Sequence, residues 1–432
     1  MTRFQIIFSA IVVLLGVAGI ATFALSKSGS GSNVPQLVMW GTLRSEVVSG
    51  FLSSVESDVQ KTFKVTYVQK SPATIESEMI AQLARGMGPD MILMPQDFIV
   101  KQLDKFYIVP FENYSERTFK DSFIQEGELY LAPDGIIGFP FTVDPLVMYW
   151  NRDILTNEGY SRPPTSWTEF FTMAPKIVKR DGAGNISQAL IAFGETRNVT
   201  HAKNMIALLS IQAGTPIVSF DSQGNIVSVF DEGTGGLIPS EQALSYFVEF
   251  SNPNKSSYSW NRSMPNDKTA FAAGKLAVYF GSASELASIR AANPNLNFDV
   301  AAIPQTSGAS GNKVAFGSMN AIAIVKASPN PAAAFIAATN LSGLDLQTRW
   351  TEYSGFPPVR RDMFATLPSD AYKSVFYQSA LIAKGWLDPD KEGTNEAFMR
   401  MVDNVTSGKM RVSEAVRAAS LEMDRMIANT AL

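Results

Sequence analysis

The chain has 432 residues, of which 46% are hydrophobic and 18% are charged, and its formal net charge is −4. This length and composition indicate a folded protein of two domains or lobes, and the even spread of charges predicts no nucleic-acid partner. With no cysteine and a single histidine, His201, disulfides are excluded, thiol, Ser-His and zinc chemistry are disfavoured, and we expect no metal and no cofactor.

The first segment along the chain is apolar. After Arg3, residues 4–25 are almost entirely hydrophobic, and as a helix they would span about 33 Å, enough to cross a bilayer core. The apolar part of a secretory leader is usually shorter, about 7–15 residues. We therefore predict a single-pass anchor over 1–25 with the folded part outside the cytoplasm; cleavage near Ser26, giving a secreted or periplasmic protein, is the alternative. Residues 26–33, "SKSGSGSN", predict a flexible Gly/Ser tether.

Strands and helices alternate after the tether. Residues 35–42, "PQLVMWGT", predict a strand, and apolar residues then recur at helical spacing between Val47 and Val59. A second strand is expected at 63–69, a helix capped by Thr74 follows, and the continuous apolar run at 89–97 is typical of a parallel strand covered on both faces. This alternation predicts an α/β lobe.

A second α/β pattern occupies the middle of the chain. Residues 163–182 predict a helix whose start carries a capping box, Ser166 with Glu169. The segments 181–187 and 220–230 resemble calcium loops superficially, but they have too few carboxylates at the ligand positions and predict hairpin turns instead. Further strands are expected at 295–304 and 319–326, and an amphipathic helix that packs on a lobe is expected at 412–427.

Several segments, taken together in chain order, carry a family resemblance. They are "LVMWGT", "IESEMIAQLARGMGPDMILMPQDFIVKQLDKFYIVPF", "IIGFPFTVDPLVMYWNRDIL", "AFAAGKLAVYFGSASELASIR", "FDVAAIPQ", "GSMNAIAIVKASPNPAAAFIAATNL" and "EYSGFPPVRRDMF". In this order and spacing, the chain after the tether resembles the bacterial extracellular solute-binding proteins of the sugar-binding type. That class includes maltose-binding protein and supplies ABC importers. No single segment is specific, so the resemblance rests on their combination.

The resemblance implies a two-lobed α/β fold of the periplasmic-binding-protein type (type II), whose lobes are joined by crossing hinge strands around a ligand cleft. It also implies a binding protein without catalytic residues, which we expect to be a monomer that passes its ligand to the permease subunits of an ABC transporter. The expected parts are lobe 1 at 34–142 plus 305–355, lobe 2 at 146–299 plus 356–432, and hinges near 142–146, 300–304 and 355–359.

Two aspartates are the principal candidates for ligand contact. A carboxylate accepts pairs of sugar hydroxyls, and an aromatic ring covers the C–H face of a sugar. The resemblance places Asp97 and Asp144 where sugar-binding relatives have acidic ligand contacts, although Phe98 departs from the pattern and the particular sugar cannot be carried over. The alternatives are an Asp-Pro turn in which Asp144 caps local N–H groups, and a helix N-cap at Asp97.

The remaining candidates are aromatic side chains and one glycine near strand ends, hinges and loops. Trp260 lies in the polar loop "SSYSWNRSMPND", where burial of an indole is hard to arrange, so stacking on a ligand or plain exposure is expected. At Gly281, the resemblance implies backbone amides close to the ligand, with packing against a neighbouring lobe as the alternative. The full set of expected ligand contacts is Trp40, Asp97, Asp144, Tyr149, Trp260, Phe280, Gly281 and Phe356.

The predicted function is capture of a small ligand, a carbohydrate, between the two lobes. Three alternatives stay open. A polyamine or another small solute could bind to the same fold, since carboxylates and aromatics also suit cations. A secreted glycoside hydrolase could use Asp97 and Asp144 as its two carboxylates. A docking or sensor protein without a ligand would also fit an uncleaved anchor.

Overall fold

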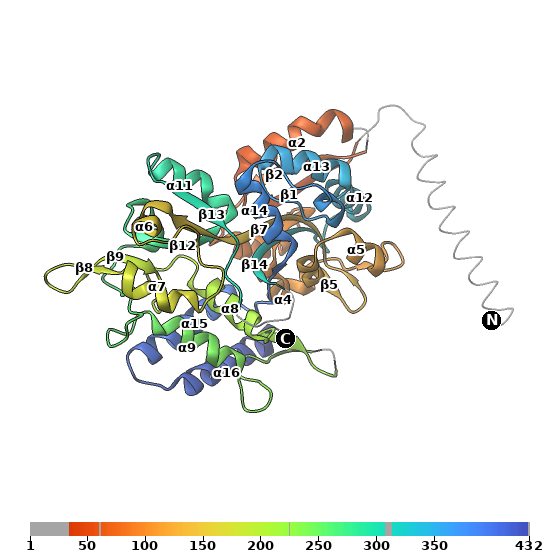
Figure 1. Cartoon of the computed structure of the whole chain (residues 1–432). Coiled ribbons are helices and arrows are strands. Elements are labelled where there is room, and N and C mark those ends of the chain that lie inside the picture. Colours follow the sequence, from red (N-terminus) through yellow and green to blue (C-terminus); the bar gives the residue numbers. More distant parts are fainter. Residues whose placement is uncertain (1–33, 60–61, 224, 307–312, 431–432) are drawn as a thin grey trace, which may run out of the picture.

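The computed structural model describes residues 34–59, 62–223, 225–306 and 313–430. They form two lobes that lie side by side and are joined by the long strands β7 (Gly138–Asn151) and β14 (Ala315–Ile324), as Figure 1 shows. The predicted anchor at 1–25 and tether at 26–33 lie outside the described residues. Within the described ranges, no helix is both long and apolar enough to cross a membrane.

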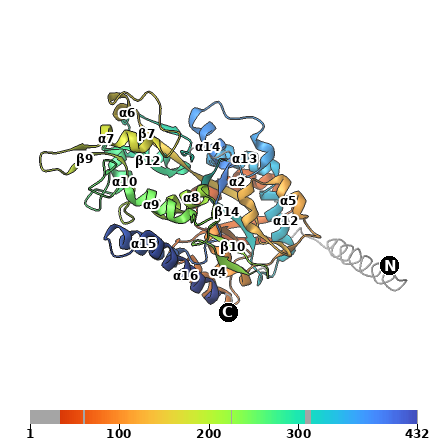
Figure 2. The same cartoon turned by 60° about the horizontal axis from the view of Figure 1, so that its bottom comes forward.

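Lobe 1 begins with the predicted alternation of strands and helices. Strand β1 lies between β2 and β3 and pairs with both in parallel, while β14 pairs with β3 in the antiparallel sense. Helices α12 and α13 come from much later in the chain; α13 lies beside α2, and α12 packs against α13 and β14 (Figure 1 and Figure 2). The elements are β1 Gln36–Gly41, α2 Ser45–Val59, β2 Lys64–Gln69, α3 Ile75–Leu83, β3 Met91–Pro95, η2 Gln96–Phe98, α4 Ile99–Gln102, η3 Leu103–Lys105, β4 Val109–Pro110, α5 Glu116–Ser122, η4 Gln125–Tyr130, β5 Leu131–Ala132, β6 Gly135–Ile136, α12 Pro331–Leu341, α13 Leu344–Ser354 and η6 Arg361–Phe364.

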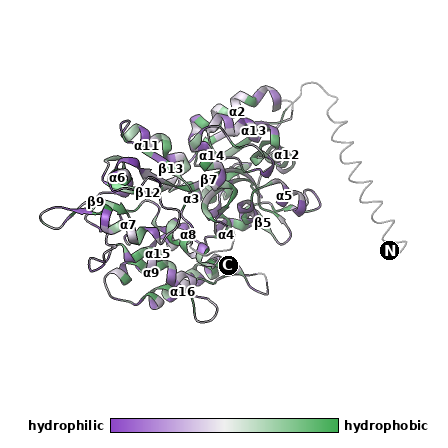
Figure 3. Ribbon diagram, viewed as in Figure 1, coloured by the Kyte–Doolittle hydropathy of each residue, from purple (hydrophilic) through white to green (hydrophobic). Residues whose placement is uncertain are grey.

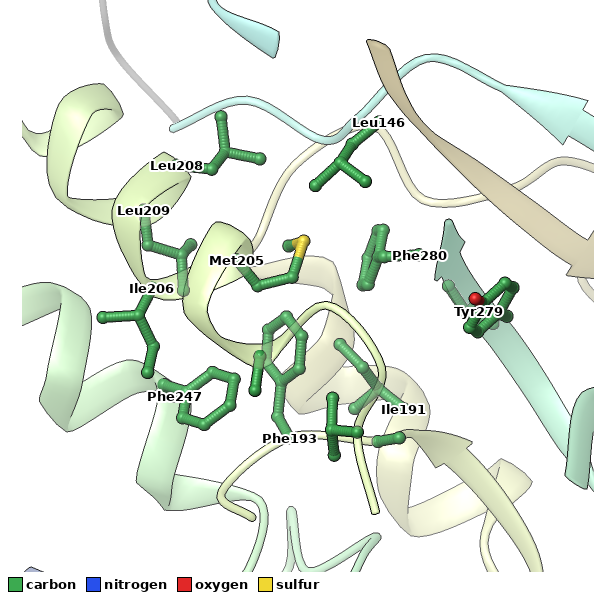
Figure 4. Packing of buried hydrophobic residues seen from close by; sticks show 14 of the residues in the cluster. Leu146, Ile191, Phe193, Met205, Ile206, Leu208, Leu209, Phe247, Tyr279 and Phe280 are labelled. Carbon is green, nitrogen blue, oxygen red and sulfur yellow. The ribbon is translucent and has the colours of Figure 1, made fainter. Parts of the chain in front are cut away.

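Lobe 2 has its own apolar core. Phe280 of the central strand β12 points toward Met205 of α8 and toward Phe193, as Figure 4 shows. The elements are α6 Arg152–Asn157, α7 Glu169–Ile177, β8 Lys179–Arg180, β9 Ile186–Ile191, α8 Ala202–Ala213, β10 Val218–Phe220, β11 Ile226–Ser228, α9 Pro239–Glu249, α10 Asp267–Ala272, β12 Leu276–Ser282, η5 Ala283–Glu285, α11 Leu286–Ala292, β13 Phe298–Ala301, α15 Lys391–Thr406 and α16 Val412–Thr430.

The outer helices are amphipathic. Figure 3 shows hydrophilic and hydrophobic residues mixed along α2, α12 and α13. In α2, Val48, Phe51 and Val55 recur at helical spacing and are completely buried. In the terminal helix α16, Val416 and Met423 are buried in the core of lobe 2, so the expected apolar face of this helix is confirmed.

The two segments whose sequences resemble calcium loops form hairpins. Strand β8 pairs with β9 and β10 pairs with β11, both in the antiparallel sense. In the first turn, the carboxylate of Asp181 accepts hydrogen bonds from the backbone N–H groups of Ala183 and Asn185, each at 2.9 Å. The carboxylate thus stabilises the turn itself, and the predicted hairpins are confirmed.

Strand β7 carries the chain from one core into the other. Phe139, Phe141 and Val143 pack in the core of lobe 1, whereas Leu146 and the residues after it pack in the core of lobe 2. The change takes place around Asp144, where β7 pairs with β14. The hinge expected near 142–146 falls at this change.

The second passage between the cores differs from the expected position. In β14, Phe316 packs in the core of lobe 2 and Met319 packs in that of lobe 1. The passage therefore lies within β14 and not near 300–304. The reason is that Val300 belongs to β13, which pairs with the lobe 2 half of β7 and keeps this segment in lobe 2.

The third passage is also displaced. The glycine of "SGFPPV", Gly355, ends α13 in a left-handed conformation, with φ of 78°, but Val359 stays in the core of lobe 1. Helix α14 (Ala371–Leu381) and strand β15 (Ala383–Lys384) follow. Helix α14 contacts both cores, with Phe376 in lobe 2 and Ala380 in lobe 1, and Trp386 after β15 packs in lobe 2. The passage therefore lies over α14 and β15 and not near 355–359.

Candidate functional site

A cavity of about 630 Å³ lies between the two lobes. Lobe 1 contributes the end of β3 and the η2 turn, and β14 contributes the floor where it passes between the cores. Lobe 2 contributes the segment that leads into α8 and the start of α15. The lining residues are Pro95, Gln96, Asp97, Thr196, Arg197, Val199, Thr200, His201, Ala202, Lys203, Asn204, Asn266, Phe316, Ser318, Met319, Asn320, Trp386, Asp388, Lys391, Glu392, Asn395, Phe398 and Met399.

The lobe 1 wall is fixed by the side chain of Gln96. Its Nε2 donates to the carbonyl of Gly317 at 3.1 Å, and its Oε1 accepts from the N–H of Met319 at 2.9 Å. The turn after β3 is thereby tied to the backbone of β14. Because Gln96 is buried, these bonds set the position of the next residue, Asp97, at the carboxyl end of a parallel strand, where open α/β sheets bind ligands.

The lobe 2 wall is organised by two aspartates just before α15. Asp390 caps the helix, since its side chain accepts from the N–H of Gly393 at 2.8 Å. The other, Asp388, is buried; its carboxylate accepts from the Lys203 ammonium and from the Thr394 hydroxyl. Burial raises the pKa of Asp388 and Lys203 opposes that shift. Lys203 also donates to the carbonyl of Lys391 at 3.0 Å, which locks this wall together.

Charged groups of the two lobes meet at the cavity. The Asp97 carboxylate lies 3.1 Å from the Lys391 ammonium, and the Lys101 ammonium lies 2.9 Å from the Asp390 carboxylate. Burial alone would lower the pKa of Lys391, but Asp97 and other nearby carboxylates raise it above the ordinary value. In this conformation, two ion pairs join the lobes, and one of them, between Asp97 and Lys391, belongs to the cavity lining.

Three buried aromatic side chains also line the cavity. The rings of Trp386 and Phe398 stack with their centroids 6.1 Å apart and an interplanar angle of 4°, and Phe316 also lines the cavity. Trp386 is 3% exposed. The sequence analysis missed Trp386, although a tryptophan followed by two aspartates before a helix was an available signal. Among the described residues, no group of three or more His, Asp or Glu side chains could hold a metal ion.

Of the residues expected to contact a ligand, Asp97 lines this cavity. Asp144 does not: its carboxylate accepts from the N–H of Ser284 at 3.0 Å and from the Ser284 hydroxyl at 2.6 Å. Burial raises the pKa of Asp144 to about 6, while the bonds from Ser284 act in the opposite direction. The partner is far away in sequence, so the local Asp-Pro turn is not what occupies this carboxylate; Asp144 instead ties β7 to the η5 turn.

Two of the expected aromatic contacts lie inside lobe 2. Trp260 is completely buried, and its indole N–H donates to the Asn198 side chain at 3.2 Å. The polar loop allows this burial because its neighbour Ser259 bonds the backbone of β9. Tyr149 is also buried and donates to the carbonyl of Ser282 at 2.8 Å. Neither ring offers a face to a ligand in this conformation.

The other expected contacts also lie away from the cavity lining. Trp40 lies under the ammonium of Lys70, 4.0 Å from the ring centroid, and Phe356 stacks on Trp350. Phe280 packs in the lobe 2 core. At Gly281, a Cβ would lie 2.4 Å from the ring of Tyr279, so close packing within lobe 2 accounts for this glycine.

Comparison with known proteins places this geometry in context. Residues 56–398 match the family described as bacterial extracellular solute-binding protein. A binding protein of Brucella abortus (strain 2308) is 23% identical over 291 residues, which is 66% of this chain; the chain spans 66% of the length of that relative. A cyclo/maltodextrin-binding protein in complex with maltotetraose has a TM-score of 0.73 at 14% identity, covering 92% of this chain and 98% of the other. The sugar-binding protein MalE of Xanthomonas citri has a TM-score of 0.72 at 18% identity, covering 91% and 98%. At these identities the structural likeness shows the two-lobed α/β fold.

Proposed function

The chain belongs to the bacterial extracellular solute-binding proteins, and from this premise we propose that it captures a carbohydrate between its lobes and delivers it to an ABC importer. The observation that carries the proposal is the cavity of about 630 Å³ with walls from both lobes, a volume in the usual range for small-molecule sites. A ligand that contacts both walls is held fully only when the lobes are together, so it shifts the equilibrium toward the closed form.

The charge balance of the cavity supports a neutral ligand. The carboxylates of Asp97 and Asp388 are each paired with a lysine, Lys391 and Lys203. A neutral polyol can use the remaining hydrogen-bonding groups of such a site without displacing an ion pair. Trp386, Phe398 and Phe316 also line the cavity and contribute apolar atoms of the kind that contact the C–H groups of sugars. Structural neighbours named for maltodextrin and sugar binding support the same class.

The alternatives fit the cavity less well. A polyamine needs carboxylates that are available for its ammonium groups. Asp97 and Asp388 already have lysine partners, which leaves Glu392 among the carboxylates of the lining. A glycoside hydrolase needs two carboxylates around one ligand, but Asp144 is bonded to Ser284 outside the cavity lining. The family and the structural neighbours are binding proteins and not enzymes.

The proposal also covers the N-terminal residues 1–33, the movement of the lobes and the oligomeric state. Residues 1–25 would anchor the chain in the cell membrane and 26–33 would tether the lobes outside the cytoplasm, near the permease; cleavage near Ser26 would release them. The apolar length of 4–25 supports the anchor. We expect the lobes to pivot at the strand segments where the chain passes between the two cores, β7 near Asp144, β14 and β15, and the protein to act as a monomer.

A thermal-shift screen tests the ligand class. The full-length chain would be mixed with maltotetraose, mannotriose, tagatose, spermidine and a short peptide, and binding to the native state raises Tm in proportion to the logarithm of ligand concentration over Kd. We expect a rise with at least one saccharide and none with spermidine. A rise with spermidine alone would replace the carbohydrate assignment by the polyamine alternative.

A further inference from the structure

Opposite charges from the two lobes meet at the cavity in a crossed arrangement. In lobe 1, Asp97 and Lys101 lie four residues apart after β3, and in lobe 2, Asp390 and Lys391 are neighbours at the start of α15. Asp97 pairs with Lys391 at 3.1 Å and Lys101 pairs with Asp390 at 2.9 Å. Lys101 also pairs with Glu76 of its own lobe at 2.9 Å. The order of the charges is therefore acid then base on both sides, and the pairs run across the cleft.

The backbone beneath Lys391 is held from within lobe 2. Asp390 caps α15 through Gly393, and Lys203 donates to the carbonyl of Lys391. The Lys391 side chain, which is 49% exposed, extends from this fixed backbone to the opposite lobe. The distance between the Lys391 ammonium and the Asp97 carboxylate therefore depends on how close the two walls are, because a shift of lobe 1 by a few ångströms separates this pair.

Asp97 uses only one of its two oxygens in this pair. Its Oδ2 faces Lys391, whereas its Oδ1 is buried and has no hydrogen-bond partner among the residues that the structure describes. A buried carboxylate oxygen without a partner is unfavourable. Asp97 itself lines the cavity, so a ligand there would lie beside the pair of Asp97 and Lys391.

We propose that Lys391 sets the selectivity of the cleft: from the opposite lobe it occupies the Oδ2 atom of Asp97, so that a ligand beside this pair must be uncharged. The class of that ligand rests on the proposed function; the inter-lobe pair does not. A cationic ligand at Asp97 would meet the ammonium of Lys391, and an anionic ligand at Lys391 would meet the carboxylate of Asp97. Both juxtapositions are unfavourable, so the pair excludes charged ligands by repulsion.

The same pair also has an effect when no ligand is bound. It exists only when the walls are close, so it favours the closed form, and because Lys391 is half exposed, salt weakens the attraction. Binding selectivity and closure therefore have one origin and can be measured separately.

The first measurement is the distance between the lobes. Because the sequence has no cysteine, spin labels can be attached to Arg117→Cys in α5 and Arg417→Cys in α16, both exposed, in the full-length chain without ligand. We expect Lys391→Met to shift the distance distribution toward longer values, and high salt to shift the wild-type chain in the same direction. Lys391→Arg, which keeps the charge, should behave as wild type. Lys409→Met removes an exposed lysine of the same lobe and should change nothing. Equal distributions for Lys391→Met and Lys409→Met would overturn the proposed effect on closure.

The second measurement uses putrescine as a cationic probe. By calorimetry, we expect Lys391→Met to bind putrescine at least about tenfold more tightly than the wild-type chain, because a like charge is removed, while Lys391→Arg and Lys409→Met show no gain. Unchanged putrescine binding by a Lys391→Met variant that unfolds at the wild-type temperature would overturn the selectivity role. If no saccharide binds the wild-type chain but this gain is observed, the carbohydrate assignment fails and the role of Lys391 stands.

Discussion

The turn at Asp97 and the strand at Asp144 each place a carboxylate near a junction between the lobes, yet the two carboxylates are engaged in different ways. At Asp144, both oxygens accept from Ser284, within the structure that joins β7 to lobe 2. At Asp97, one oxygen faces a lysine of the other lobe and the second is buried without a partner among the described residues. The difference indicates that the Asp144 carboxylate serves the fold by joining two elements next to lobe 2, whereas the Asp97 carboxylate pairs across the cavity and depends on how close the lobes are.

The largest expected effect concerns Trp260, whose role we expect to be structural. Trp260→Ala removes a completely buried indole and should lower the free energy of unfolding by about 3–5 kcal/mol. Urea denaturation measures it. Trp260→Phe keeps most of the volume and should leave saccharide affinity unchanged. A loss of saccharide affinity without a loss in the free energy of unfolding would mean that Trp260 contacts the ligand.

The second prediction concerns the affinity for the ligand and the role of Asp97 in it. Asp97→Ala should weaken saccharide binding by about 1.5–3 kcal/mol, the usual contribution of a hydrogen bond to a charged group, with little change in the Tm of the unliganded protein. Calorimetry with the saccharide found in the screen measures the loss. The matched control is Asp134→Ala, which removes an exposed aspartate of lobe 1. Equal affinities for the two variants would place the ligand away from Asp97.

The smallest expected effect is a pH dependence at Asp144. Burial raises the pKa of this carboxyl to about 6 in the folded protein, against about 3.9 in an unfolded chain. The folded state therefore holds the proton at higher pH, so the free energy of unfolding falls as pH rises from about 4 to about 6. Since the residue is only partly buried, we expect a change of about 1–2 kcal/mol at most.

Asp144→Asn tests this dependence because it keeps an acceptor for the N–H of Ser284 but cannot ionise. The variant should lose the decline between pH 4 and pH 6 that the wild-type chain shows in urea unfolding, and Asp134→Asn should retain it. Parallel profiles for the wild type and Asp144→Asn would mean that this carboxyl titrates at an ordinary pH.

Much of the fold follows from local sequence patterns. The alternation of strands and helices from β1 to β3 and the apolar face of α16 depend on residues close together in the chain, and these predictions are confirmed. The passages between the lobes depend on which core a side chain enters. The "SGFPPV" segment looks like a break because Gly355 ends a helix, but Val359 remains in lobe 1, which no local pattern reveals.

The site was less predictable, for a related reason. Asp97 could be predicted to lie at the cavity because it follows a buried strand. Lys391 could not, since it becomes significant only by lying 3.1 Å from a carboxylate that is distant in sequence. Trp260 was misjudged because polar neighbours suggested exposure, whereas Ser259 and Asn198 satisfy the buried polar groups around it.

The position of β14 has a consequence for folding during synthesis and export. This strand lies between β3 and β7 in the sheet, although it comes from residues 315–324. A ribosome or export channel that releases the chain from its N-terminus therefore leaves the first lobe incomplete until most of the polypeptide has emerged. Long-range pairing of this kind folds slowly and exposes unpaired strand edges in the meantime, so truncated products would be open to chaperones, proteases and aggregation.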